Sequence, residues 1–306
     1  MILRLALSAS LLLAAAGAFQ ARNAAEAYRP GETPDRIILN WTEDASTGFS
    51  VTWRTSPQVK EAYAEIAEAG ENHEFAKNAR RVKAATEAYE TDLGRAHSHS
   101  VTFTGLTPAT RYSYRVGDGH SWSAWNTLKT ATQQAEPFTF LYLGDAQNGI
   151  LPYWSRLIRA AYAHAPDARF IVHAGDLINR FNSDAEWGEW HQGGGWVNQI
   201  MPSLPTPGNH EYGRLEENGP RTLTVNWRHQ FTLPLNGVEG AGETNYFVDI
   251  HNLRFISLNS NLLQKEQAEW LEKTLAGNKK TWTVVAFHHP VYSTAVRRDN
   301  KELREM

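Results

Sequence analysis

Short runs of apolar and β-branched residues, separated by polar turns, cover the chain from about residue 34 to residue 133. Such runs are typical of β-strands that bury one face. The clearest runs lie at 36–41, 49–53, 101–104 and 112–116. The last two alternate with period two, and Gly117-Asp-Gly119 forms a turn after them. The pattern predicts a small β-sandwich over 34–133.

Beyond a linker at 130–137, the pattern changes to strands that alternate with helices, which is typical of a layered α/β domain. Predicted strands lie at 138–143, 168–173, 253–258 and 282–287. Apolar residues recur at helical spacing over 151–161, and 264–276 reads as an amphipathic helix that ends at Gly277. The residues expected on its inner face are Trp270, Leu271 and Leu275. The second predicted domain is 137–306.

The N-terminus has the features of an export signal. Arg4 provides a positive start, and 5–19 is apolar or small apart from two serines. We predict a signal peptide over 1–27, cleaved after Ala18 or Ala27, with an uncut anchor as the alternative. No later stretch is long enough to span a bilayer, so we expect an exported protein without a membrane span, either periplasmic or extracellular.

Composition excludes several classes of protein. The 306 residues include no cysteine, which excludes disulfide frameworks, cysteine-ligated zinc and a thiol nucleophile. The hydrophobic fraction of 42% is that of an ordinary globular protein. Because the net charge is −3, we expect no nucleic-acid duplex as a partner.

Four polar motifs close strands of the second domain. They are Gly-Asp-Ala-Gln at 144–147, Gly-Asp-Leu-Ile-Asn at 175–179, Gly-Asn-His-Glu at 208–211 and His-His-Pro at 288–290. A single Gly-Asp pair is usually only a turn, but groups at the carboxyl ends of strands in an open α/β sheet gather in one crevice. Two metals about 3.5–4 Å apart hold a water and a phosphate together and lower the pKa of that water to roughly 7. The motifs therefore predict a dinuclear site that cleaves phosphoesters.

These motifs, together with 185–190 and Pro205-Thr-Pro207, make the chain resemble the calcineurin-like metallophosphoesterases. Within that group it resembles the purple acid phosphatases with an N-terminal fibronectin type III-like domain, whose tyrosine corner has a counterpart at 106–112. The resemblance runs from about residue 34 to the end. It implies a β-sandwich followed by a layered α/β domain with two mixed sheets flanked by helices.

The resemblance assigns roles to five residues. Asp145 would bind the first metal, Asp176 would bridge both, and Asn209 and His288 would bind the second. His210 would protonate the leaving oxygen during in-line attack of a metal-bridging hydroxide on a phosphomonoester. The implied cofactors are two divalent or trivalent ions of Fe, Mn or Zn.

Two residues depart from the family pattern. Asn179 replaces the tyrosine that colours the purple enzymes, so we expect a colourless or weakly coloured protein with Asn179 as a structural loop residue. Gln147 stands where many relatives have histidine, and its amide oxygen is a candidate ligand. The family's last signature, Gly-His-x-His, does not occur before Met306. We therefore expect a domain truncated at its C-terminus and poorly active alone.

The substrate is less well defined by the sequence. His289, Arg297 and Arg298 are candidate phosphate contacts, with packing or a solvated basic pair as the alternatives. We expect a phosphorylated small molecule or a nucleotide as the partner. A phosphodiesterase or nucleotidase with the same metals is one alternative. A non-catalytic exported protein that binds through the aromatic-rich sandwich is another.

Overall fold

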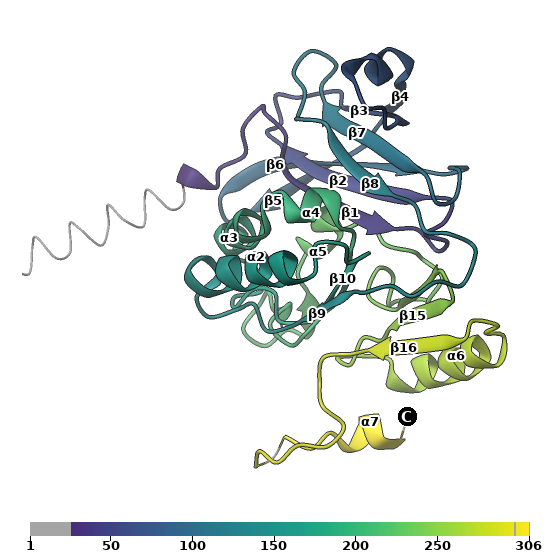
Figure 1. Ribbon diagram of the computed structural model, residues 1–306. Coiled ribbons are helices and arrows are strands. Elements are labelled where there is room, and N and C mark those ends of the chain that lie inside the picture. The colour runs from purple at the N-terminus through teal and green to yellow at the C-terminus, as the bar shows by residue number, and fades with distance from the viewer. Residues whose placement is uncertain (1–25, 297, 306) are drawn as a thin grey trace, which may run out of the picture.

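The computed structural model describes residues 26–296 and 298–305 (Figure 1). Most of the predicted signal peptide and the candidate Arg297 lie outside these residues. Within the described residues, no helix is long and apolar enough to cross a membrane.

Between Asp35 and Lys129, two four-stranded antiparallel sheets form a sandwich, as predicted. The first sheet has the order β1 (Asp35–Trp41), β2 (Phe49–Thr55), β6 (Gly94–Phe103) and β5 (Ala85–Thr91). The second has the order β4 (Arg80–Lys83), β3 (Tyr63–Glu68), β7 (Arg111–Gly117) and β8 (Asn126–Lys129), with the turn η1 (His73–Asn78) between β3 and β4. The sequence pattern did not predict β3, β4, β5 or β8. β4 and β5 carry little apolar alternation, because their side chains are mostly exposed.

The corner motif closes one end of this sandwich. The hydroxyl of Tyr112 accepts a hydrogen bond of 3.0 Å from the backbone N–H of Thr107. The side chain of Leu106 beside it is buried. This is the tyrosine corner that the sequence predicted, and it fixes the loop that precedes β7.

Between Leu141 and Ala286, two three-stranded sheets form the layered α/β part. The first contains β11 (Ser203–Thr206), β10 (Ile171–Ala174) and β9 (Leu141–Leu143). The second contains β14 (Tyr246–Ile250), β15 (Leu253–Ser257) and β16 (Trp282–Ala286). The second sheet is mixed, as predicted, whereas the first is parallel throughout. The difference follows from the connections of the first sheet, because each is a helical crossover, which joins parallel strands.

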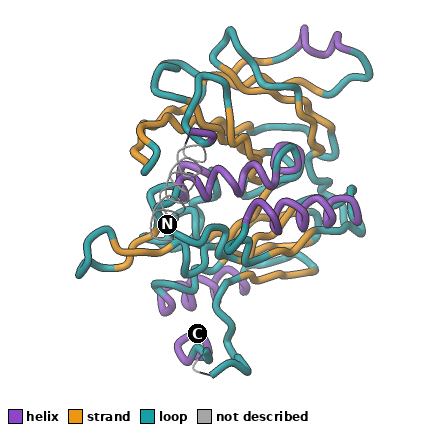
Figure 2. Tube along the Cα trace, turned by 90° about the vertical axis from the view of Figure 1, so that its left-hand side faces the viewer, coloured by secondary structure: helices purple, strands orange, loops and turns teal. Residues whose placement is uncertain are grey.

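Helices flank these sheets, and some of them lie on the side that faces the sandwich (Figure 1). They are η2 (Ile150–Trp154), a π-helical turn, α2 (Ser155–His164), α3 (Asp184–Gly194), α4 (Val197–Ile200), α5 (Trp227–Gln230), α6 (Gln264–Ala276) and α7 (Lys301–Glu305). A hairpin, β12 (Tyr212–Arg214) and β13 (Arg221–Leu223), separates α4 from α5. Figures 1 and 2 show α7 on a segment that projects away from both sheets.

The predicted helix at 264–276 is confirmed as α6, but the prediction for one of its side chains was wrong. Trp270 points inward, where its indole N–H donates to the carbonyl of Asn236 and its ring lies against Phe247. Leu275 is 42% exposed. Five residues correspond to about 140° around a helix, so Leu275 lies off the face that carries Trp270.

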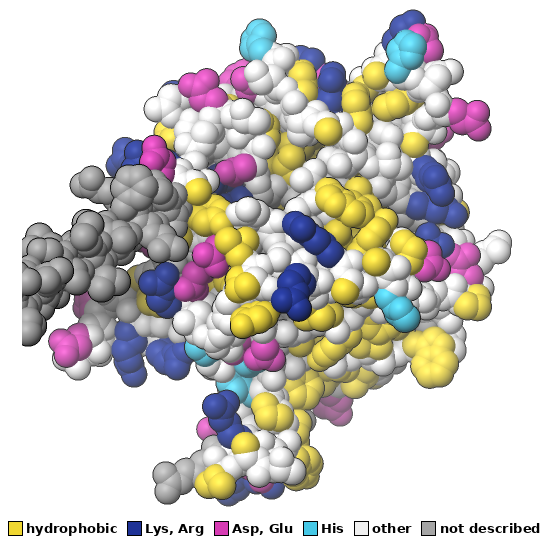
Figure 3. All heavy atoms as spheres, turned by 60° about the vertical axis from the view of Figure 1, so that its left-hand side comes forward, with side chains coloured by type: hydrophobic (Ala, Val, Ile, Leu, Met, Phe, Trp, Pro, Cys, Tyr) yellow, Lys and Arg dark blue, Asp and Glu magenta, His cyan; other side chains and the backbone are white. Residues whose placement is uncertain are grey.

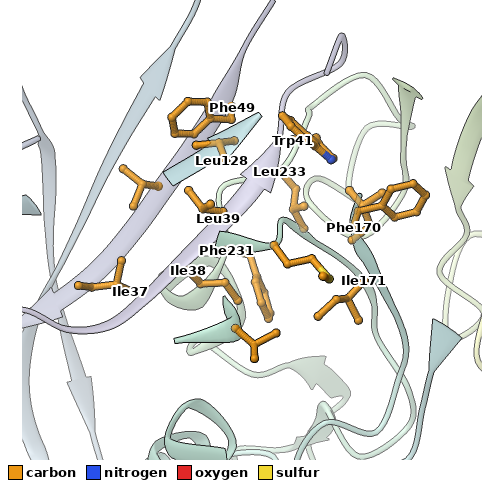
Figure 4. Close-up of a cluster of buried hydrophobic side chains, with 14 of the residues drawn as sticks. Ile37, Ile38, Leu39, Trp41, Phe49, Leu128, Phe170, Ile171, Phe231 and Leu233 are labelled. Atoms are coloured by element: carbon orange, nitrogen blue, oxygen red, sulfur yellow. The ribbon is translucent and has the colours of Figure 1, made fainter. Parts of the chain in front are cut away.

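The sandwich and the α/β part share one buried core. Figure 4 shows Ile38 of β1 beside Ile171 of β10 and Phe231, and all three are fully buried. Hydrogen bonds cross the same boundary, including one of 2.8 Å from the side-chain amide of Asn40 to the carbonyl of Ser203. The sandwich therefore packs against the strands that support the polar motifs.

A buried ionic network reinforces this boundary. Asp184, at the start of α3, accepts hydrogen bonds from Arg36 at 2.5 Å and from Arg54 at 2.7 Å. Arg54 also pairs with Asp35 at 2.7 Å, and the backbone N–H of Asp184 donates to Asp92 at 2.8 Å. The side chains of Asp184 and Arg54 are 0% and 2% exposed. The first turn of α3 is thus held by both β1 and β2.

Candidate metal centre

The four polar motifs converge in space. Asp145, Asp176 and His288 each lie two residues after the end of a strand, and Asn209 lies three residues after β11. Ligand atoms of Asp145, Asp176 and His288 all lie within 4.8 Å of one another. Figure 3 shows histidine and acidic side chains together just above the projecting C-terminal segment. The strand arrangement therefore brings the predicted ligands to one place.

Glycines in two motifs allow this close approach. A Cβ on Gly208 would lie 2.1 Å from Oδ1 of Asp176. A Cβ on Gly175 would lie 2.6 Å from Nδ1 of His288, and Gly175 also has a φ of +87°. Asp145 and Asp176 themselves adopt left-handed backbone conformations, which aspartate tolerates better than most residues. The motifs need glycine because backbone and ligand side chains pack directly against each other.

A hydrogen bond to the backbone fixes the orientation of the His288 ring. Its Nδ1 donates a hydrogen bond of 2.8 Å to the carbonyl of Ala174. Its Nε2 therefore faces Oδ2 of Asp176 at 3.2 Å and Oδ1 of Asn209 at 3.3 Å. Backbone carbonyls that hold one ring nitrogen in this way are typical of histidines that ligate metals. Burial lowers the pKa of His288, but the hydrogen bond and charge of Asp176 outweigh it and raise the pKa to about 9.

Asp176 lies at the centre of the cluster and is 3% exposed. Its Oδ1 accepts from the backbone N–H of His210 at 2.8 Å, and its Oδ2 accepts from Nε2 of Gln147 at 3.0 Å. Burial raises the pKa of Asp176, but hydrogen bonds from His288 and the His210 N–H outweigh it, so the pKa is lowered. The carboxylate is therefore held ionised, with Oδ2 facing His288 and Gln147.

Gln147 provides the test of whether a metal fits. Its amide nitrogen contacts Asp176, while its Oε1 is buried and has no hydrogen-bond partner among the described residues. A buried amide oxygen without a partner is costly unless a cation or water satisfies it. Carboxylate, amide oxygen and imidazole donors together suit Mn²⁺, Zn²⁺ or iron. The residues present fit a metal site.

His210 lies beside the cluster rather than in it. Its Nδ1 donates a hydrogen bond of 2.6 Å to the backbone carbonyl of Asn179. Its Nε2 lies 3.9 Å from Oδ2 of Asp176. Asn179 thus contacts the site through its backbone, and its N–H is in turn held by Glu186 at 2.8 Å.

The candidate phosphate contacts are less closely placed. His289 is half-buried, and its Nδ1 lies 2.8 Å from the hydroxyl of Ser260. Burial, then the charge of His288, lowers the pKa of His289, and Arg221 and Arg298 act in the same direction. Arg298 is exposed and Arg297 lies outside the described residues, so contact between either arginine and phosphate stays a prediction.

Two functional candidates were missed from the sequence. Arg221 donates from Nη2 to the carbonyls of Asn209 at 2.5 Å and Tyr212 at 2.7 Å. A single arginine between Pro220 and Thr222 gives no signal of a site in the sequence. Glu211 was visible as the last residue of Gly-Asn-His-Glu, but no role was assigned to it.

Glu211 connects two of the motif loops. One carboxylate oxygen accepts from the backbone N–H groups of Leu177 at 2.7 Å and Ile178 at 3.3 Å. The other accepts from those of Asp176 at 2.9 Å and Gly208 at 2.7 Å. Burial and the charge of Asp176 raise the pKa of Glu211 to about 7, and the backbone N–H groups oppose this shift. Through these bonds, Glu211 holds the loop after β10 against the loop after β11.

Both parts of the chain match models of known protein families. Residues 34–130 match the model of the purple acid phosphatase N-terminal domain, and residues 91–306 match that of the calcineurin-like phosphoesterases. Purple acid phosphatase 15 of Arabidopsis thaliana is 25% identical over 243 residues, which cover 68% of this chain and 44% of that protein. An uncharacterized protein of Mycobacterium tuberculosis (strain H37Rv) is 24% identical over 310 residues, covering 87% of this chain and 56% of that protein. The chain thus spans about half the length of these relatives.

Two solved structures share the fold. The purple acid phosphatase from yellow lupin (Lupinus luteus) seeds aligns with a TM-score of 0.68 at 20% identity, over 87% of this chain and 52% of that one. The structure of PhoD aligns with a TM-score of 0.58 at 16% identity, over 83% of this chain and 62% of that one. Both include a large share of the α/β part as well as the sandwich.

Proposed function

Because the chain belongs to the calcineurin-like phosphoesterase family, we propose that it acts as a metal-dependent phosphoester hydrolase of the acid phosphatase type, with phosphomonoesters as substrates. The observation that carries the proposal is the convergence of Asp145, Asp176 and His288 from separate strands within 4.8 Å. The similarity to purple acid phosphatases supports the monoester preference. The apolar stretch at 5–19 supports export from the cytoplasm.

The positions of the side chains support a ligand set for two ions. Asp145 and Gln147 would hold one ion, Asn209 and His288 the other, and Asp176 would bridge them. Two bound ions of Fe, Mn or Zn would supply Lewis acidity and lower the pKa of water.

The chain's own contribution to bond cleavage centres on His210. Hydrolysis forms a bond from phosphorus to a water oxygen and breaks the bond from phosphorus to the alcohol oxygen. In its protonated form, His210 would give its Nε2 proton to that leaving oxygen, while Nδ1 stays bonded to the carbonyl of Asn179. We extend the proposal to His289, Arg297 and Arg298 as phosphate contacts, because imidazole and guanidinium groups donate hydrogen bonds to phosphate oxygens.

The test is phosphate release from p-nitrophenyl phosphate by the whole natural protein, with Mn²⁺ or Zn²⁺ restored after chelation. We expect hydrolysis that depends on metal and falls at least a hundredfold in Asp176→Asn. Asp167→Asn makes the same change on an exposed loop and serves as the matched control. Activity that survives both chelation and Asp176→Asn would refute the proposal. Faster hydrolysis of bis(p-nitrophenyl) phosphate would refute the monoester preference.

A further inference from the structure

A hollow of about 300 Å³ opens beside the metal centre. Asn209 and His289 form the wall that it shares with the centre. The remaining walls come from the hairpin β12–β13, the loop after β15, the start of α6 and the segment that includes α7. An alcohol attached to a phosphate at the metal centre would therefore lie in this hollow.

The walls of the hollow are almost entirely polar. The polar side chains that line it beyond the shared wall are Tyr212, Arg221, Ser260, Asn261, Gln264, Asn300 and Glu302. Leu262 is the apolar residue among them. A site for an aromatic ring or a nucleobase is usually lined by apolar or aromatic faces. The ring of Tyr212 is not accessible for stacking, because the residue is 7% exposed and its hydroxyl accepts a hydrogen bond from Asn259.

Donors and acceptors are both available in the hollow. Across the described part of the chain, no hydrogen-bond partner contacts Nε or Nη1 of Arg221, Oδ1 of Asn261 or Oε1 of Gln264. A hydroxyl group both donates and accepts, so a chain or ring of hydroxyls satisfies such a mixed wall.

Two of these groups are held in place by the loop that carries the metal ligands. Nη2 of Arg221 is bonded to the carbonyl of Asn209 at 2.5 Å. The side-chain amide of Asn261 donates to the carbonyls of Pro207 at 3.3 Å and Gly208 at 3.2 Å. The free atoms of Arg221 and Asn261 therefore have fixed positions relative to the site of phosphate cleavage.

We infer that this hollow binds the polyol portion of the substrate, so that the chain acts on small polyol phosphates such as glycerol phosphate or a hexose phosphate. The inference rests on the proposed function and narrows its substrate class. Gln264 and Asn261 accept hydrogen bonds from the hydroxyls, and Arg221 donates to them. The hollow gives the base of a nucleotide no surface on which to stack. The ring of an aryl phosphate would leave the polar groups of the walls without hydrogen-bond partners.

The test compares two substrates in three variants of the metal-loaded protein. Gln264→Leu removes an acceptor, and we expect kcat/KM for glycerol 2-phosphate to fall about tenfold. We expect the fall for p-nitrophenyl phosphate to be much smaller. Gln264→Glu keeps an acceptor at this position and should restore most of the lost preference. Gln58→Leu makes the same chemical change on the exposed surface of the sandwich and is the matched control.

A second readout does not depend on turnover. Saturation-transfer NMR on metal-free protein should detect glycerol 2-phosphate bound to wild type and to Gln58→Leu, with a weaker signal in Gln264→Leu. Equal losses for both substrates in Gln264→Leu, or preferred hydrolysis of AMP, would overturn the polyol assignment. If the wild-type protein hydrolyses no phosphoester, the proposed function fails, and the NMR signal alone then decides whether the hollow binds a polyol phosphate.

Discussion

At the level of single residues, the proposed metal centre depends on neighbours that are not themselves candidate ligands. Gly208 lets the backbone pass next to Asp176, and Glu211 fastens the loops on which Asp176 and Asn209 lie. Each of these contacts is made within a few residues of a ligand. The geometry of the site is therefore sensitive to small changes that leave every ligand in the sequence.

Gly208→Ala should weaken metal binding. The new Cβ would lie 2.1 Å from Oδ1 of Asp176, so the carboxylate has to move. Losses of supporting contacts around a metal typically cost ten- to a hundredfold in affinity, and we expect a loss of about that size in a calorimetric Mn²⁺ titration. Gly31→Ala is the control, because a Cβ there meets nothing within 4 Å. Equal affinity in both variants would show that the close packing around Asp176 is unimportant.

His99 should make the sandwich less stable in acid. Burial, with a smaller effect of His97, lowers the pKa of His99 from 6.5 to about 4. Below about pH 6.5, the unfolded chain binds a proton at His99 that the folded chain does not bind. The stability that neutral His99 contributes is therefore complete above about pH 6.5 and is lost as the pH falls toward 4. His99 alone should cost about 2 kcal/mol of unfolding free energy between pH 7 and pH 5.

Urea unfolding at the two pH values measures this loss. His99→Gln should reduce the difference between pH 7 and pH 5 by about 2 kcal/mol relative to wild type. His120→Gln, at an exposed position, should leave it unchanged. The same pH dependence in His99→Gln and wild type would rule out the titration of His99.

The sequence was most informative about residues that belong to the four polar motifs. It predicted the convergence of Asp145, Asp176 and His288, since each closes a strand. It did not predict Arg221, which lies beside the site because it donates hydrogen bonds to the backbone carbonyls of Asn209 and Tyr212. Contacts of this kind have no local pattern and become visible only in three dimensions.

Among the secondary-structure elements, α3 has an unusual position. Its first residue, Asp184, is buried between two arginines of the sandwich, and its tryptophans Trp187 and Trp190 are fully buried. The pattern of apolar residues did not predict a helix at 184–194. A helix buried on several sides lacks the apolar stripe that reveals an amphipathic helix.

Asp184→Asn should destabilise the protein strongly. The variant leaves Arg36 and part of Arg54 without their buried countercharge, and breaking such a pair typically costs about 3–5 kcal/mol. Chemical unfolding at neutral pH measures the change. Asp167→Asn, on the surface, should change the unfolding free energy by less than about 0.5 kcal/mol. A similarly small effect of Asp184→Asn would mean that the network contributes nothing to stability.

A proline hid one strand from the pattern analysis. Pro205 lies within β11, opposite His173 of β10, and the sequence pattern predicted no strand at 203–206. β11 is at the edge of its sheet, where a residue without a backbone N–H is tolerated. Strands that lie at an edge, or whose side chains are exposed, carry weaker sequence signals than buried strands.

For the whole molecule, the order of a sandwich followed by an α/β domain followed from the change of pattern near residue 137. The sequence did not predict how closely the two parts pack. Ile38 and Phe231 are far apart in the sequence, and each could be recognised only as a core residue. The change of pattern predicted two domains, and buried side chains of both parts form one continuous cluster (Figure 4).

The shared core predicts that the two parts unfold together. Differential scanning calorimetry of the metal-free protein should give one transition, since separating the parts would expose Ile38, Ile171 and Phe231. Asp184→Asn, which loosens the boundary, should lower the temperature of that transition. Two well-separated transitions in wild type would show that the sandwich and the α/β part are independent.

The central claim is that the ends of four strands form a metal centre. The most direct test is an anomalous difference map from crystals of the protein soaked in Mn²⁺. We predict strong anomalous density between Asp145, Asp176, Asn209 and His288, with Asp176 in contact with it, and none in Asp176→Asn crystals. A map without density among these side chains, or with Mn²⁺ bound only elsewhere, would contradict the account.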